Sequence, residues 1–483
     1  MTVWNDDRAR RSALQHAERL RALTSTERDM IRLVQDPGFR RWLDQMHAIG
    51  GCAHPIYLSG QTTTRDAATG EVLRVYSTAD EPHGVLAVRC GNRRESRCEP
   101  CSRLHGGDTF HLVRAGLLGG KTVPAAVADH PRLFVTLTAP GFGPVHRATT
   151  DQRCRPRRSG GQCSHGRNLG CGAIHDDSDA AVGQPLCPAC YDYSAHVLWH
   201  AKAGELWNRT CIQIRRDLAA TLSVKQRDLN DHLRVSFAKV AEYQKRGAVH
   251  VHAVIRVDGP DGPQTPPPAR VNSRLLTKVI KGAVEDAETR TPYAPALGEY
   301  AIKWGEQFDV HSIRAETENA TVTDSAVAAY VAKYVSKSIG DAGGTDHRIT
   351  SFAEIELLPA SLHFRTLMGT CWRLGGIPAL DPLRLRLWAH TLGYRGHVLT
   401  KSQKYSTTYA ALQSSRAEHR LSGSGLGGDS ESAESIESVW RYVRSGHSLA
   451  ESEIAEGIRQ DSETLRNVRK DIEPAWRRSA VGL

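Results

Sequence analysis

The sequence predicts an α+β fold, in which a central antiparallel sheet carries a His-x-His hairpin and is flanked by helices. Residues 233–244 and 248–257 are rich in Val and alternate with polar residues, and residues 245–247 contain a glycine between them, a pattern typical of two strands joined by a turn. Residues 195–222 and 272–289 are predicted to be helices. Cys-rich stretches add zinc modules to this fold, and both terminal segments are predicted to be helical.

The composition is that of a soluble globular protein with a polyanionic partner. The chain has 483 residues, 40% hydrophobic and 24% charged, with a formal net charge of +10. We find neither an apolar signal core nor an apolar run long enough to span a bilayer, so we expect a cytoplasmic protein with no membrane partner. In that compartment its 11 cysteines are expected to be metal ligands or free thiols rather than disulfides.

The length allows two or three domains, and changes in composition suggest five segments. Residues 1–48 read as helices with a break at Pro37-Gly38, and Leu421 begins a Gly- and Ser-rich linker ahead of a tail that is predicted to be helical from residue 433. Lys401 to Tyr405 is basic with one aromatic residue, which fits either a DNA contact or a solvated face. The predicted segments are a helical N-terminal segment at 1–50, a Cys-rich zinc-binding module at 51–130, a catalytic domain at 131–345 with a second Cys-rich insertion at about 145–192, a basic mixed α/β region at 346–420, and a linker with a helical tail at 421–483.

The hairpin is the first candidate site. Side chains alternate along a strand, so His250 and His252 point to one face, and a turn centred near Arg246 brings Glu242 opposite His250. Two imidazoles and a carboxylate suit a divalent cation with open positions. Gln244 is the alternative third ligand, because it lies on the same face of the same strand. A His-x-His pair is also common as ordinary strand histidines in a chain with 22 histidines.

A helix near residue 330 is the second candidate. Thr323, Asp324 or Ser325 can cap it. At about 100° per residue, two phenols and two ammonium groups fall on one face, opposite an apolar face. The alternative is an amphipathic helix whose Tyr and Lys side chains merely lie along the surface. The residues on the polar face are Tyr330, Lys333, Tyr334 and Lys337.

The Cys-rich stretches predict structural zinc. In the first, Cys90, Cys98 and Cys101 are three thiolates, and Cys52 or His105 is the fourth ligand. Nearby arginines could contact phosphates, or zinc could simply hold a loop-rich segment together. In the second stretch Cys154 or a histidine could replace one member of a four-thiolate set. That set is Cys163, Cys171, Cys187 and Cys190.

Three motifs in order resemble those of rolling-circle replication initiators of the His-hydrophobic-His nickase superfamily. They are Phe134-Val-Thr-Leu-Thr138, Glu242 with His250-Val-His252, and Tyr330 with Tyr334. The tyrosine motif is similar to that of the gene A proteins of small single-stranded DNA bacteriophages. The rest of the chain, including the Cys-rich parts and residues 399–408, resembles the initiators of actinomycete conjugative and integrative plasmids.

The resemblance implies a plasmid rolling-circle initiator that cuts and rejoins one DNA strand at a replication origin, on single-stranded or supercoiled DNA. Mg²⁺ or Mn²⁺ at His250, His252 and Glu242 would polarise the phosphate, and Tyr334 would make the first cut, with Tyr330 serving the closing transfer. Lys333 or Lys337 would favour the phenolate, and a host helicase is expected as a partner. The alternatives are a two-tyrosine single-strand DNA transposase and a zinc-stabilised DNA-binding protein without chemistry.

Overall fold

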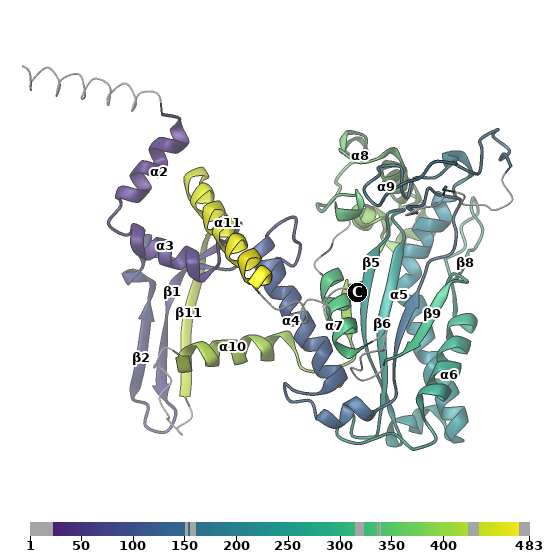
Figure 1. Cartoon of the computed structure of the whole chain (residues 1–483), viewed down its shortest axis with the longest axis horizontal. Coiled ribbons are helices and arrows are strands. Elements are labelled where there is room, and N and C mark those ends of the chain that lie inside the picture. Colours follow the sequence, from purple (N-terminus) through teal and green to yellow (C-terminus); the bar gives the residue numbers. More distant parts are fainter. Residues whose placement is uncertain are drawn as a thin grey trace, which may run out of the picture. The chain divides into compact units, whose positions relative to one another are not determined.

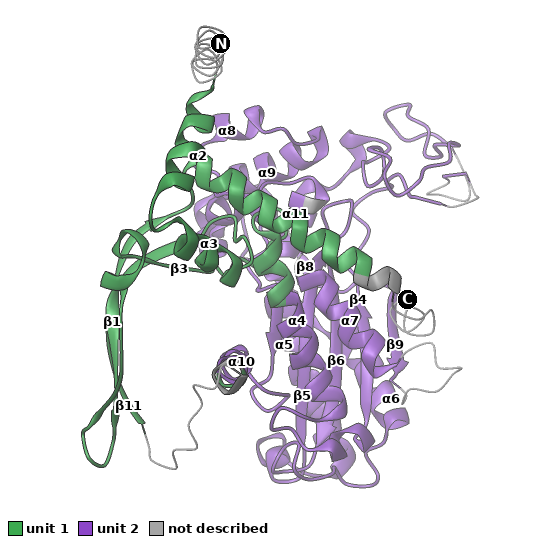
Figure 2. Cartoon of the chain, turned by 60° about the vertical axis from the view of Figure 1, so that its left-hand side comes forward, with its two compact units in different colours: residues 1–105, 418–482 green, residues 106–417, 483 purple. Residues whose placement is uncertain are grey.

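The computed structural model describes residues 23–149, 153–154, 161–313, 323–335, 337, 340–423 and 434–472 (Figure 1). The chain forms two compact units. The first comprises residues up to 105 together with residues from 418 onward, and the second comprises residues 106–417 (Figure 2). The C-terminal segment thus completes the N-terminal unit, which the division into five consecutive segments did not anticipate.

The second unit is built on a five-stranded antiparallel sheet. Its strand order is β10-β5-β6-β4-β9, and every pair in it is antiparallel. The expectation of an α+β fold with antiparallel sheets and several Cys clusters is therefore confirmed. The strands are β4 (Arg132–Leu137), β5 (Arg234–Tyr243), β6 (Val249–Asp258), β9 (Phe308–Ser312) and β10 (Leu399–Lys401).

Helices cover both faces of this sheet (Figure 1). On one face, the β6 side chains Val251 and Ile255 join a core with α5 (Tyr193–Leu222) and α6 (Ser273–Asp286). On the other face, Val254 packs with α7 (Asp324–Val335) and with the C-terminal half of α4 (Glu99–Leu118). The two cores follow from the alternation of side chains along β6, because neighbouring residues point to opposite faces.

The hairpin turn between β5 and β6 requires its glycine. Gly247 has a φ of 77°, which an L side chain rarely adopts. A Cβ at this position would also meet Leu392 at 3.0 Å and both Leu367 and Phe364 at 3.3 Å. The turn is therefore held between the sheet and α9 (Leu362–Leu374), and the register of the hairpin follows from it.

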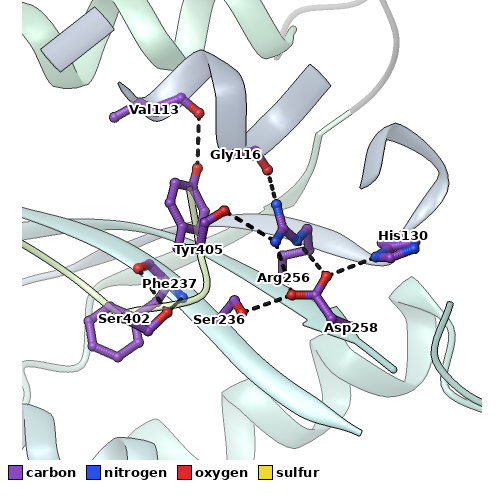
Figure 3. Close-up of polar contacts among 9 residues, drawn as sticks. All are labelled: Val113, Gly116, His130, Ser236, Phe237, Arg256, Asp258, Ser402 and Tyr405. Carbon is purple, nitrogen blue, oxygen red and sulfur yellow. Dashed lines mark hydrogen bonds and ion pairs between the residues drawn. The ribbon is translucent and has the colours of Figure 1, made fainter. Parts of the chain in front are cut away.

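A buried polar network ties β6 to α4 and to the segment after β10 (Figure 3). Asp258 accepts hydrogen bonds from the Arg256 guanidinium at 2.6 and 2.9 Å and from Ser236 at 2.8 Å, and it pairs with His130 at 2.8 Å. The Tyr405 hydroxyl donates to the Val113 carbonyl at 3.2 Å. Tyr405 is fully buried and belongs to the core, whereas Gln403 and Lys404 of the same stretch are exposed, so only part of residues 401–405 is available as a solvated face or a DNA contact.

The tail of the chain differs from the prediction. Residues 434–445 form the strand β11 (Glu434–Ser445), which pairs antiparallel with β1 (Ile56–Asp66) along its whole length. The prediction of a helix throughout the tail is therefore wrong. The β-branched and aromatic residues of this stretch favour a strand, and β1 satisfies its backbone groups. The helix α11 (Leu449–Ile472) follows, as expected for the last part.

The first unit also contains α2 (Ser25–Gln35) and α3 (Phe39–Ala48), which agree with the predicted helices and the break at Pro37-Gly38. Residues 1–22 of the predicted N-terminal segment and 424–433 of the predicted linker lie outside the described residues. No described helix is long and apolar enough to cross a membrane. The remaining elements are β2 (Val72–Ser77), β3 (Leu86–Val88), β7 (Glu288–Arg290), β8 (Ala301–Lys303), α8 (Phe352–Leu357) and α10 (Tyr409–Gly423).

Candidate functional site

The hairpin and α7 bring the predicted site residues to one face of the sheet. Glu242 on β5 pairs with His250 on β6, and Thr136 on β4 pairs with His252. These four side chains point to the face of the sheet on which α7 packs. On β6, residues two apart point to the same face, and Val254, two residues after His252, packs with α7. The strands therefore present a carboxylate and two imidazoles toward the tyrosine helix.

The start of α7 is fixed by a cap and a buried ion pair. The Thr323 hydroxyl accepts a hydrogen bond from the Ala326 amide at 3.2 Å, so Thr323 is the capping residue among the three candidates. Asp324 instead accepts two hydrogen bonds from the Arg132 guanidinium, at 2.9 and 2.8 Å. Both side chains are buried. Arg132 lies on β4, so this pair sets the position of α7 on the sheet; its role was not recognised from the sequence.

His252 is the centre of the site. Its Nδ1 hydrogen-bonds the Thr136 hydroxyl and its Nε2 hydrogen-bonds the Tyr330 hydroxyl, each at 3.1 Å. Glu242 Oε2 lies 3.5 Å from the same Nε2. The ring of Phe134 stacks on the imidazole with centroids 5.9 Å apart. Both ring nitrogens are thus oriented, and Tyr330 stands beside the nitrogen that faces Glu242.

His250 provides a second imidazole in an uncharged form. Its Nε2 is buried and makes no hydrogen bond within the described part of the chain. Burial, followed by the nearby His252 and Arg246, lowers the pKa of His250 to about 4. A neutral imidazole with a free lone pair is the form in which histidine binds a metal ion.

The two tyrosines lie together beside two lysines. The Tyr330 and Tyr334 rings are 4.5 Å apart between centroids. Burial, then the hydrogen bond with Tyr334, raises the pKa of Tyr330. Lys337 Nζ lies 4.5 Å from the centre of the Tyr334 ring, and Lys333 Nζ lies 5.7 Å from it. Lys337 also approaches Glu242 Oε1 at 3.7 Å. The ammonium groups are therefore concentrated at Tyr334.

A pocket of about 180 Å³ reaches this cluster at the C-terminal end of β5. Tyr334, Lys337, Glu242 and Gln244 contribute to its lining. The Gln244 side-chain oxygen accepts a hydrogen bond from Arg246 at 3.0 Å. Of the two candidates for the third ligand, Glu242 is the one whose oxygen lies next to His252.

The Cys-rich parts form three groups that can hold a metal such as zinc, each with ligand atoms within 4.8 Å of one another. The Cys52 cluster contains Cys52, Cys90, Cys98 and Cys101, so Cys52 rather than His105 is the fourth member. The Cys163 cluster contains Cys163, His165, Cys187 and Cys190. The His146 cluster contains His146, Cys154, Cys171 and His175.

The four-thiolate set predicted for the insertion is therefore wrong in one member, and its stated alternative, in which a histidine replaces one cysteine, is the arrangement that the structure contains. Cys171 lies in the His146 cluster, and His165 takes its place beside Cys163. The spacing Cys163-x7-Cys171 matches Cys90-x7-Cys98, but here it joins two different clusters. His146 was not recognised as a ligand from the sequence, although His146-x7-Cys154 has the same spacing and could have indicated it.

Comparison with known proteins gives a consistent answer. The family model "RepSA: Replication initiator protein, pSAM2" matches residues 38–460. The chain is 41% identical over 459 residues to a replication initiator protein from Streptomyces ambofaciens, an alignment that covers 92% of this chain and 95% of the relative. No solved structure gives a significant match. The chain therefore belongs to the family of pSAM2-type replication initiator proteins.

Proposed function

We propose that this replication initiator nicks one strand of its plasmid origin by attack of a tyrosine hydroxyl on the scissile phosphate. The observation that carries the proposal is the contact of the Tyr330 hydroxyl with His252 Nε2 at 3.1 Å, with Tyr334 and Glu242 beside them. Tyr330, one of the two candidate nucleophiles, lies 78 residues from His252 in the sequence, and the fold brings the two within hydrogen-bond reach. The net charge of +10 suits a DNA partner.

The donor set fits a divalent metal such as Mg²⁺ or Mn²⁺. Within the described residues His250 Nε2 has no hydrogen-bond partner, the His250 and His252 rings lie 4.7 Å apart between centroids, and Glu242 Oε2 lies 3.5 Å from His252 Nε2. These three residues would hold the ion, which would act as a Lewis acid on the phosphate. Gln244 is the weaker candidate because Arg246 already engages its oxygen.

Tyr334 is the better candidate for the first cut. It lines the pocket, and the ammonium groups of Lys337 and Lys333 lie beside its ring, where they can stabilise the negative charge that develops on the attacked phosphate. In the reaction the phenol loses its proton and its oxygen bonds to phosphorus, while the bond to the 3′ oxygen breaks and that oxygen takes up a proton. The products are a 5′-phosphotyrosyl protein and a free 3′ hydroxyl.

Tyr330 is then placed for the closing transfer. Its pKa is raised by burial, so its hydroxyl stays protonated at neutral pH and hydrogen-bonded to His252 until the second step. A second phenol within reach of the same phosphate can accept a new 5′ end while the first is released. The transfer conserves the energy of the phosphodiester bond but supplies none for unwinding, so a host helicase is the expected partner.

The test is covalent capture on an origin-derived single-stranded oligonucleotide with Mn²⁺, read on a denaturing gel. We expect Tyr334→Phe and His252→Ala to reduce the adduct at least about 100-fold, because each removes a group that acts on the phosphate. Tyr293→Phe, at a tyrosine that is 66% exposed, is the matched control and should behave as the unmodified protein. All variants should bind the oligonucleotide normally, since binding draws on many Lys and Arg residues.

Three outcomes would contradict parts of this proposal. An adduct that survives in the Tyr330→Phe, Tyr334→Phe double variant would remove both tyrosines from the chemistry. Loss in Tyr330→Phe alone would reverse their roles. Specific binding with no adduct under any metal would favour a DNA-binding protein without chemistry.

A further inference from the structure

We propose that the His146 cluster binds a zinc ion of its own, so that each chain carries three structural zinc ions. The cluster is separate from the Cys163 cluster in the same insertion, and its ligand set of two sulfurs and two nitrogens differs from that of the other two clusters. Two-sulfur, two-nitrogen sites are one of the standard tetrahedral zinc sets.

The distances between ligand atoms support a tetrahedral site. Zinc bonds of about 2.0–2.3 Å imply ligand separations of roughly 3.3 Å between nitrogens and roughly 3.8 Å between sulfurs. His146 Nδ1 lies 3.2 Å from His175 Nε2, and Cys171 Sγ lies 3.3 Å from that same Nε2. In the Cys52 cluster, Sγ of Cys52 lies 3.7 and 3.6 Å from those of Cys98 and Cys101, which is far from a disulfide bond.

The surroundings orient the ligands. Asp179 pairs with His175 Nδ1 at 2.5 Å, so the proton of the imidazole sits on that nitrogen and the Nε2 lone pair points into the cluster. The Asp179 carboxylate itself accepts the Ala181 amide at 2.8 Å. The Cys154 sulfur accepts a hydrogen bond from the Arg147 amide at 3.4 Å, which helps to fix the position of this sulfur. A carboxylate behind a histidine ligand is the usual arrangement at protein zinc sites.

The cysteine inventory agrees with three sites. The chain has 11 cysteines, and the three clusters use nine of them. The other two, Cys211 and Cys371, lie in the hydrophobic core of the second unit. Every thiol in the Cys-rich parts therefore has a place in one of the clusters, whereas a two-zinc chain would leave Cys154 and Cys171 without a metal.

The His146 cluster also adjoins the catalytic hairpin. The backbone of His146 exchanges hydrogen bonds with Gln184 and Gly183, each at 2.9 Å. A Cβ at Gly183 would lie 2.4 Å from the Lys245 carbonyl, so the backbone of this segment packs directly on the turn between β5 and β6. Zinc at the His146 cluster would hold this segment against the turn that sets the position of Glu242 and His250.

The test is the zinc content of the full-length protein, purified without chelator and measured by elemental and native mass spectrometry. We expect three zinc ions per chain. His175→Ala should retain two, and His175→Cys should restore three because a thiolate can replace the imidazole. The matched control, His232→Ala at an exposed histidine, should retain three.

Cobalt substitution identifies which site is lost. The intensity of thiolate-to-cobalt absorption increases with the number of bound thiolates, and the three clusters contain nine cysteines. Loss of the His146 cluster in His175→Ala should therefore lower the absorption by about two ninths, and loss of the Cys163 cluster in Cys163→Ser by about three ninths. Two zinc ions in the unmodified protein would overturn the proposal. So would three zinc ions in a folded His175→Ala variant.

Discussion

The His–Tyr site and the Cys-rich insertion lie in the same unit but are held in opposite ways. The site residues stand on long paired strands and on α7, and the ten-residue strands β5 and β6 pair along their full length. Between β4 and α5, the described residues contain a single three-residue 3-10 helix, Pro188–Cys190, as regular structure. A backbone ladder supports the first region, whereas the second depends on its ligand clusters.

From this contrast we expect the two regions to tolerate change differently. In the sheet, each residue shares its support with neighbours on both sides, and Arg132 and Arg256 add buried ion pairs. In the insertion, four side chains per cluster replace a hydrophobic core. Metal-binding free energy in such segments is folding free energy.

The strongest test of the comparison is removal of zinc. After treatment with a strong chelator, we expect the backbone amides of residues 161–190 to lose most of their protection against hydrogen exchange, while those of β5 and β6 keep theirs. The reason is that, of these two regions, the insertion is the one whose order depends on the clusters. Readdition of zinc serves as the control and should restore protection. Equal loss in β5 and β6 would show that the two regions are not independent.

A smaller effect is expected from the ion pair that positions the tyrosine helix. Arg132→Met leaves Asp324 buried without its partner, which should lower the free energy of unfolding of the second unit by about 3–5 kcal/mol. Denaturant unfolding measures it. The matched control is Arg290→Met, which removes the surface ion pairs of Arg290 with Glu288 and Glu299 and should cost much less, because water screens exposed pairs. An equal cost for both variants would mean that burial adds nothing to the pair.

Acid should weaken the sheet through His200. Its Nε2 accepts the Val249 amide and its Nδ1 donates to the Leu392 carbonyl, both at 3.0 Å, and burial lowers its pKa to about 3. The ordinary pKa is near 6.5, so the unfolded state takes up the proton first. The contribution of His200 to the free energy of unfolding is therefore fully present above about pH 6.5. It decreases toward pH 3, by up to roughly 1.4 kcal/mol per pH unit.

The measurement is the unfolding free energy at pH 7 and pH 5. His200→Gln keeps an acceptor for the Val249 amide but cannot titrate, so its stability should change less between the two pH values than that of the unmodified protein. His196, His250 and His363, buried histidines with lowered pKa values, remain in both proteins and contribute to the residual slope. Identical pH dependence in the two proteins would assign the acid sensitivity elsewhere.

Local patterns in the sequence were sufficient for much of the site. A side-chain period of two and a glycine turn at residues 245–247 leave one register that buries the Val face of the hairpin, and this register pairs Glu242 with His250. The helical period likewise places Tyr330 and Tyr334 on one face, and their rings do contact each other. These features depend on neighbours in the chain.

The tertiary structure decided which distant residues meet. Arg132 finds Asp324, β11 completes the sheet begun by β1, and Cys171 joins His146 instead of Cys163. Because Cys90 and Cys98 are as far apart in the sequence as Cys163 and Cys171, the sequence suggested that the second pair also shares one zinc site. Sequence spacing shows only which residues could approach one another, and in the structure Cys163 and Cys171 lie in different clusters. The path of an irregular loop depends on all of its ligands and contacts at once, and no periodic pattern in the sequence encodes it.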